Sequence, residues 1–379
     1  MKKAVLVVSI LSMAINSALV AEEIGTIQVT STKLSDVSGE EVKSADLADA
    51  LTKKLPSVSI VRRSGIANDI ILRGQKKDNI NITIDDAKVY GACPNRMDPP
   101  TSHILVNNIE SIEVIEGPYD VENFGTLSGS VKIITKEPTK DFKGEANLNL
   151  GSWNYRKAAA TVSGGNDDVR YLVSVSRETS DQYKDGDGNT FSEQIINYGA
   201  AMGDQYQPTY ADMKAYEKST FLGKIYADIA NNQQLKFSYT ANRSDDVLYP
   251  SSKMDALYDD SNIANLKYSI TGLGEYSKSL DIQLYNSHVD HPMSNRYRRS
   301  AIMMMDMVSD LTTDMQGLKV KNNFDLNTST NVTYGLDSSN RNWDGIYIIN
   351  GTPTIKSIDD VDTQNTGLFA QMETRADKT

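Results

Sequence analysis

Sulfur and imidazole side chains occur in two short motifs whose chemistry suits a soft metal ion. Cys93 and Met97 stand four residues apart in Cys-Pro-Asn-Arg-Met, and His291 and Met293 stand two apart in His-Pro-Met. Thiolate and thioether are soft ligands that favour Cu(I), and imidazole also suits copper. Zinc is disfavoured, because thioethers are not among its usual ligands. The alternative is that Cys93 is a small buried hydrophobic residue and the methionines simply pack.

To bind one ion, the two side chains of each motif must lie on the same side of the helix or strand that carries them. Pro94 is a good first residue for a single helical turn, and such a turn would place Cys93 and Met97 on the same side. His103 and His288 have no partner at a convincing spacing, so we treat them as ordinary residues.

The N-terminus has the layout of an export signal. Lys2 and Lys3 precede an apolar run over 4–14, and small residues lead up to Ala21. The run is too short for a spanning helix, so we expect residues 1–21 to be a signal peptide cleaved after Ala21. A buried N-terminal helix is the alternative.

Composition narrows the function classes. Beyond residue 21 no stretch approaches the roughly 18 apolar residues of a membrane helix, so the mature chain is expected to be periplasmic or a β-barrel. A net charge of −11 argues against nucleic-acid binding, which needs clustered Lys and Arg. Cys93 is the only cysteine, so an internal disulfide is excluded. No nucleophile–base pair or phosphate loop stands out, and we expect no enzyme.

Residues 22–140 are predicted to form a small α+β domain. The helix expected at Ser44–Leu55 has Ser44 as its N-cap and Pro56 as its stop. Short apolar runs predict five strands, at Val58–Val61, Ile70–Leu72, Ile80–Ile84, Ile109–Ile115 and Val131–Thr135.

Residues 141–379 show a different pattern. Segments of about ten residues alternate apolar and polar side chains, which is typical of a transmembrane β-barrel and less so of a soluble β-sandwich. Gly164–Asp168 and Asn231–Gln234 are tight turns, whereas Ser180–Ser219 and Asp245–Ile263 are expected to be long loops outside the cell. We expect about ten strands. A plugged transporter barrel has about 22 strands, so the predicted fold is an α+β plug domain followed by an incomplete antiparallel barrel.

The strand that leads to the second motif has a predictable orientation. Ile282 and Leu284 mark the even positions as lipid-facing. Alternation then aims His291 and Met293, at odd positions, into the lumen.

Several segments resemble the TonB-dependent receptors of the Gram-negative outer membrane. Asp69–Gly74 resembles the Arg-Gly segment of their plug domain, and Ile112–Pro118 and Gly129–Thr135 resemble its final strands. Ile82–Asp86 resembles the Asp-Gly segment, but Asp86 stands where glycine is usual, so we expect that turn to differ in detail. A segment after the signal resembles the TonB box, which pairs with TonB by strand addition, and it consists of Ile24, Gly25, Thr26, Ile27, Gln28, Val29 and Thr30.

Within that family the two sulfur motifs resemble those of the copper receptors. The resemblance implies one metal site made of Cys93, Met97, His291 and Met293, with copper as transported ligand and no cofactor. It also implies coupling to TonB and its inner-membrane energising complex, contact with outer-membrane lipid, and a monomer. The Met303–Met307 segment could collect copper, but a flexible apolar patch is the preferred interpretation.

Two other functions stay open. A siderophore or other metal-chelate receptor would bind its ligand with loop aromatics and arginines and would tolerate loss of Cys93. The available residues are Tyr249, Tyr258, Arg296, Arg298 and Arg299. A non-transporting surface protein would be indifferent to deletion of the Ile24–Thr30 segment.

Overall fold

The computed structural model describes residues 31–34, 46–123, 125 and 127–374. The predicted signal peptide at 1–21 and the predicted TonB box at Ile24–Thr30 lie outside the described residues. Within the described ranges, no helix is both long and apolar enough to cross a membrane.

Two small sheets and one helix form the first part of the described chain. One sheet has the strand order β1-β7-β8-β5-β6 and the other the order β2-β3-β4. The strands are β1 Ser31–Leu34, β2 Val58–Val61, β3 Asp69–Leu72, β4 Gln75–Lys76, β5 Ile80–Ile84, β6 Ala87–Lys88, β7 Ile109–Glu116 and β8 Gly129–Thr135. The 3-10 turns are η3 Lys77–Asn79, η4 Pro100–His103 and η5 Val106–Asn108. All five strands predicted in this region are confirmed, with small differences at their ends.

Helix α2, Leu47–Lys54, corrects the predicted helix start. Asp46 has extended backbone angles and its carboxylate accepts a hydrogen bond from the Ala48 N–H, so Asp46 is the N-cap and Ser44 is not. The helix ends before Pro56, as predicted, and buries Leu47 and Leu51 completely.

The turn between β5 and β6 contains the unusual aspartate. Asp85 and Asp86 have φ values of +49° and +65°, so both adopt the left-handed conformation of a primed two-residue turn. The Asp85 carboxylate accepts hydrogen bonds from the backbone N–H and hydroxyl of Thr135, at 2.8 and 2.6 Å. These bonds fix a turn that glycine would otherwise form at lower cost.

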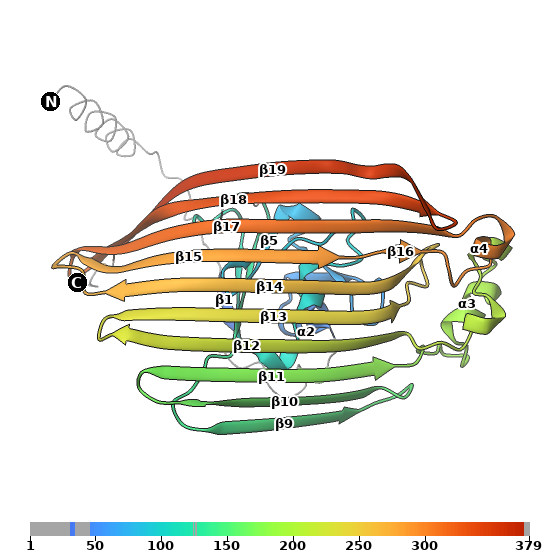
Figure 1. Ribbon diagram of the computed structural model, residues 1–379, viewed down its shortest axis with the longest axis horizontal. Coiled ribbons are helices and arrows are strands. Elements are labelled where there is room, and N and C mark those ends of the chain that lie inside the picture. Colours follow the sequence, from blue (N-terminus) through green and yellow to red (C-terminus); the bar gives the residue numbers. More distant parts are fainter. Residues whose placement is uncertain (1–30, 35–45, 124, 126, 375–379) are drawn as a thin grey trace. The chain divides into compact units, whose positions relative to one another are not determined.

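Ten long antiparallel strands form the second part, side by side in chain order (Figure 1). They are β9 Lys143–Leu150, β10 Arg156–Gly165, β11 Val169–Ser180, β12 Tyr216–Ala230, β13 Gln233–Val247, β14 Asp255–Thr271, β15 Ser277–Asp290, β17 Met307–Asn327, β18 Thr330–Ile349 and β19 Thr352–Thr374. The short β16, Met293–Ser294, pairs with both β14 and β17. The order runs from β9 to β19 without closing, which gives the predicted incomplete barrel.

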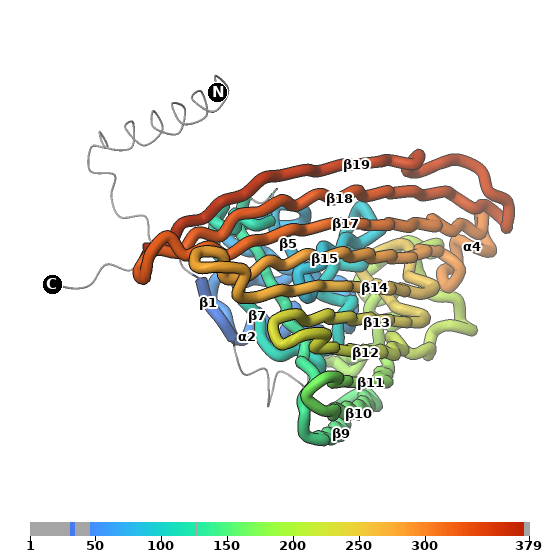
Figure 2. The backbone as a smooth tube through the Cα atoms, turned by 60° about the vertical axis from the view of Figure 1, so that its left-hand side comes forward, coloured from blue at the N-terminus to red at the C-terminus, as the bar shows by residue number. Residues whose placement is uncertain are grey.

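The large sheet curves over the small ones, and its inner face contacts them directly (Figure 2). Leu148 and Leu150 on the outer face are 81% and 84% exposed, as lipid-facing side chains of an outer-membrane barrel would be. On the inner face Gln283 and Ser287 donate hydrogen bonds to the backbone carbonyls of Asp85 and Lys88. The first part of the chain is therefore seated against the barrel wall as a plug.

The connections between strands partly follow the expected alternation. Turns 166–168, 231–232, 272–276 and 328–329 are all short and lie at one end of the sheet. The opposite end carries α3 Phe191–Asn197, η6 Met202–Asp204, η7 Pro208–Tyr210 and α4 Ser300–Met303. The long loop predicted at Asp245–Ile263 is wrong, because β13 continues to Val247 and β14 begins at Asp255. Within this segment Asp255, Asp259 and Ser261 are buried, whereas Asp245 and Lys253 are exposed.

Candidate functional site

Cys93 lies at the start of a tight turn in the loop after β6. The Arg96 N–H donates to the Cys93 carbonyl at 2.9 Å, and Arg96 has a φ of +57°. This is a β-turn with Pro94 at its second position, which proline favours. The predicted helical turn is therefore wrong, because the left-handed Arg96 reverses the chain before a helix can continue.

Asp98 fixes the conformation of this turn. Its buried carboxylate accepts hydrogen bonds from the backbone N–H groups of Ala92 and Cys93, the latter at 3.0 Å. From the barrel side, Trp343 donates to the Ala92 carbonyl at 2.7 Å, and Arg341 donates to the Gly91 carbonyl at 3.2 Å. Both side chains come from β18, so the barrel wall positions the segment that carries Cys93.

Gly91 makes this close approach possible. A Cβ at that position would lie 2.2 Å from the Asp98 carbonyl oxygen, a backbone atom that cannot swing aside. We expect Gly91→Ala to displace the Cys93 turn, to destabilise the folded protein by about 1–3 kcal/mol, and to weaken metal binding at the candidate site. Thermal unfolding and metal titration would measure both effects.

Gly186→Ala is the matched control for this substitution, since a Cβ there meets no atom within 4 Å. Equal behaviour of the two alanine variants would contradict the role assigned to Gly91.

His291 enters the site from the barrel, directly after β15. Its side chain is completely buried, and its Nδ1 lies 3.3 Å from Asp259 Oδ1 on β14. Its Nε2 has no hydrogen-bond partner among the described residues. A carboxylate that forms a hydrogen bond with one ring nitrogen orients the imidazole and leaves the other nitrogen available as a metal ligand.

The turn and the histidine meet in one buried cluster. The sulfur of Cys93, a carboxylate oxygen of Asp98 and a ring nitrogen of His291 all lie within 4.8 Å of one another. Burial alone would lower the pKa of His291, but Asp98, Asp259 and Cys93 outweigh it and raise that pKa well above its usual range. A cation at this place would take over the role of the imidazolium proton.

The two methionines belong to the same buried core. Met97 is 8% exposed and Met293 is 4% exposed. The Tyr249 hydroxyl donates to the Met97 carbonyl, and the Tyr249 ring stands edge-on to His291 with a centroid separation of 6.3 Å. The structure thus brings the ligand atoms of Cys93 and His291 together, and both methionines are buried in the same hydrophobic core.

A buried arginine supports Tyr249 from outside the cluster. Arg298 donates to both carboxylate oxygens of Asp255, at 2.7 and 2.8 Å, and to the Tyr206 hydroxyl at 2.9 Å. Asp255 in turn accepts a hydrogen bond from the Tyr249 N–H at 2.7 Å. This network holds the start of β14, which pairs with Met293.

Three acidic or imidazole residues of the site were missed by the sequence prediction. Asp98 directly follows the first motif, and its position alone could have suggested it. Asp259 stands opposite residue 291 if the pairing of Asp260 with Asp290 is continued by one position. His103, treated as an ordinary residue, lies with both of them. His288 is ordinary, since it is half-buried and lies 2.8 Å from Asp314.

Burial affects the ionisation of these plug residues. It raises the pKa of Asp98, against the opposing effect of His291. It lowers the pKa of His103, against the opposing effects of Asp259 and Asp98. A neutral His103 has a nitrogen lone pair that can bind a metal ion.

Comparison with known proteins identifies the first part of the chain. The TonB-dependent Receptor Plug Domain model matches residues 26–131. The ferric-pyoverdine 358 receptor of Pseudomonas putida is 28% identical over 159 residues, which is 41% of this chain and 19% of that receptor.

Solved structures share the fold of most of this chain. The copper transporter OprC matches with a TM-score of 0.73 and 20% identity, over 90% of this chain and 52% of that one. The FrpB iron transporter from Neisseria meningitidis (F3-3 variant) matches with a TM-score of 0.61 and 17% identity, over 80% of this chain and 48% of that one. The chain thus spans about half the length of these structures. Residues 26–131 thus match the plug domain of TonB-dependent receptors, and the chain shares its fold with these solved transporter structures.

Proposed function

We propose that this receptor imports copper, which it binds with Cys93, Met97, His291 and Met293. The observation that carries the proposal is a buried cluster. In it the Cys93 sulfur from the plug, a His291 ring nitrogen from the barrel and an Asp98 carboxylate oxygen lie within 4.8 Å of one another. Thiolate, thioether and imidazole together favour copper over the harder divalent ions. The fold shared with the copper transporter OprC agrees with this cargo.

The position of the cluster suits a transporter. Cys93 belongs to the plug and His291 to the barrel, so the ion would bridge the two parts. Arg341 and Trp343 of β18 hold the backbone just before Cys93. A bound ion would therefore change the contacts between plug and barrel wall, and TonB, acting on the Ile24–Thr30 segment, would move the plug to release the ion into the periplasm.

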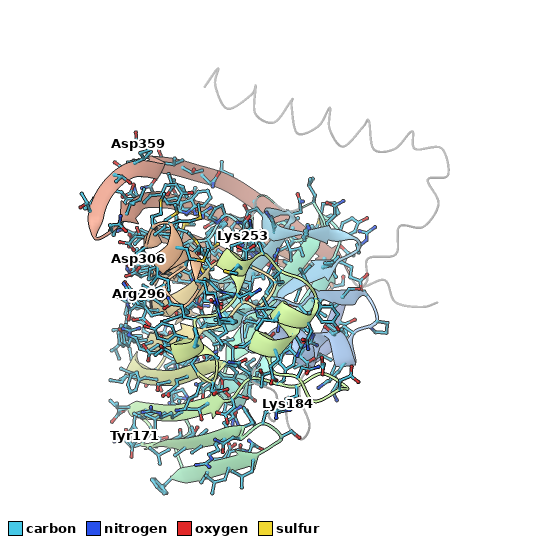
Figure 3. All side chains as sticks on the ribbon, turned by 90° about the vertical axis from the view of Figure 1, so that its right-hand side faces the viewer. Tyr171, Lys184, Lys253, Arg296, Asp306 and Asp359 are labelled. Carbon is cyan, nitrogen blue, oxygen red and sulfur yellow. The ribbon has the colours of Figure 1, made fainter. Side chains whose placement is uncertain are left out.

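A metal-chelate receptor is the second candidate, since the ferric-pyoverdine receptor and the iron transporter FrpB are among the matches. Its expected binding residues included Tyr249 and Arg298, but both are completely buried and bonded within the protein. Arg296 remains exposed, at the end of the sheet that carries α3 and α4 (Figure 3). The burial of two proposed chelate contacts favours the free ion as cargo.

Dependence on the segment that TonB would bind distinguishes an importer from a protein that only binds copper at the cell surface. We expect deletion of Ile24–Thr30 to abolish copper accumulation by cells whose uptake depends on this receptor. The deletion should leave copper binding by the purified receptor unchanged, because no residue of the cluster is removed. Radioactive copper uptake and equilibrium binding would be measured on the same preparations.

Cells lacking TonB are the control, and they should accumulate as little copper as cells that carry the deletion variant. Unchanged accumulation after the deletion would contradict an importing role and favour a surface protein without transport.

A further inference from the structure

A second group of ligand atoms lies beside the cluster of Cys93 and His291. One ligand atom from each of Asp98, His103 and Asp259 lies within 4.8 Å of the other two. Their exposed fractions are 0%, 0% and 1%. They come from the loop after β6, from η4 and from β14, so this group also joins plug and barrel.

His103 is buried without a hydrogen bond from its side chain to any described residue. Neither of its ring nitrogens has a partner within the part of the chain that the structure describes. A buried polar group without a partner destabilises the folded protein. Buried side-chain nitrogens are normally satisfied by protein, water or a bound ion. The imidazole therefore points to a ligand held between the two carboxylates.

The carboxylates have capacity left for such a ligand. The Asp98 oxygens accept from the Ala92 and Cys93 N–H groups, and Asp259 contacts the His291 ring at 3.3 Å and the Ser102 hydroxyl at 3.5 Å. A carboxylate has about four acceptor positions, so neither group is saturated. The nearby buried Lys218 donates to the Ser102 carbonyl at 2.7 Å. His291, whose pKa is raised, and Lys218 offset the charge of the two carboxylates, so the His103 imidazole, unpartnered among the described residues, is the group that indicates a ligand.

We propose that Asp98, His103 and Asp259 form a second metal site, which binds a divalent transition-metal ion of borderline softness, such as Cu²⁺ or Zn²⁺. Two carboxylates and one imidazole supply oxygen and nitrogen without sulfur, a set that suits divalent ions better than Cu(I). Three protein ligands also leave a coordination position open. This site needs neither Cys93 nor either methionine, so it goes beyond the copper site of the proposed function, although Asp98 also lies within 4.8 Å of Cys93 and His291.

Zinc binding in a chain without the thiol tests the proposal. The receptor with Cys93→Ser and Met293→Leu, purified in detergent, would be titrated with Zn²⁺, with and without His103→Gln. We expect about one Zn²⁺ per chain in the double variant, and an affinity at least about 10-fold lower once His103→Gln is added. His288→Gln in the same background is the matched control and should bind Zn²⁺ normally.

Absence of Zn²⁺ binding in the double variant, or binding indifferent to His103→Gln, would overturn the proposal. Copper binding by the unmodified receptor is measured separately, so the copper site can stand while this one fails. Zinc K-edge absorption of the unmodified receptor needs no variant. It should show nitrogen and oxygen neighbours at about 2.0–2.1 Å, and a dominant sulfur shell at about 2.3 Å would contradict the second site.

Discussion

Replacing His291 with alanine should lower the copper affinity of the receptor by at least about 100-fold, the upper end of what losing an outer-shell partner costs a metal site. The substitution removes the barrel imidazole that has a ring nitrogen within 4.8 Å of the Cys93 sulfur, and it leaves Asp259 without its ring partner. Cys93 and Met97 would remain on the plug, but the ion would no longer bridge plug and barrel. Competition with a copper chelator on the purified receptor would measure the affinity.

His288→Ala is the matched control for this prediction. His288 lies three residues earlier on β15, is half-buried and lies 2.8 Å from Asp314, away from the cluster. We expect the copper affinity of the His288→Ala variant to stay within about 2-fold of that of the unmodified receptor, since no metal ligand or outer-shell partner is lost. Equal losses in the two variants would mean that the motif histidine has no special part in binding.

Arg298→Ala should destabilise the folded receptor by about 3–5 kcal/mol, because it leaves the carboxylate of Asp255 buried without its cation. Arg298 and Asp255 are both completely buried. Asp255 also holds the Tyr249 N–H, so the Tyr249 ring should shift away from His291 and copper affinity should fall as well. Denaturant unfolding and copper titration would measure the two effects.

Arg296→Ala offers a comparison two residues away. Arg296 is exposed, and its removal should change stability by no more than about 0.5 kcal/mol. An Arg298→Ala variant as stable as Arg296→Ala would show that the buried network contributes nothing to holding Tyr249.

The sequence predicts most of the secondary structure correctly because hydrophobic periodicity is local. The dyad pattern placed Ile282 and Leu284 outside, and both are exposed, at 36% and 51%. The same pattern failed for Asp245–Ile263. Inside a plugged barrel the wall faces a polar plug instead of an apolar core, so a run of polar residues there looks like a loop although it is paired strand.

The site could be predicted only in its sulfur and motif residues. Cys93, Met97, His291 and Met293 stand in two short motifs. Asp259 lies 32 residues before His291, and His103 lies six residues after Met97, so both are outside the motifs. They reach the cluster only through the register of β14 against β15 and through the packing of η4 against the wall. The turn at Cys93 was mispredicted for a related reason. Asp98 and the left-handed Arg96 determine its shape, and Pro94 alone is compatible with a helical turn as well.

The copper content of the receptor purified from the outer membrane tests the central claim most directly. It would be measured per chain, beside the Cys93→Ala and Met293→Ala variants. We predict about one firmly held copper at the proposed site in the unmodified receptor and a sharp loss in both variants, because each removes a sulfur ligand from one side of the site. No copper in the unmodified receptor, or copper that survives both substitutions, would contradict the copper site and favour a metal chelate as the cargo.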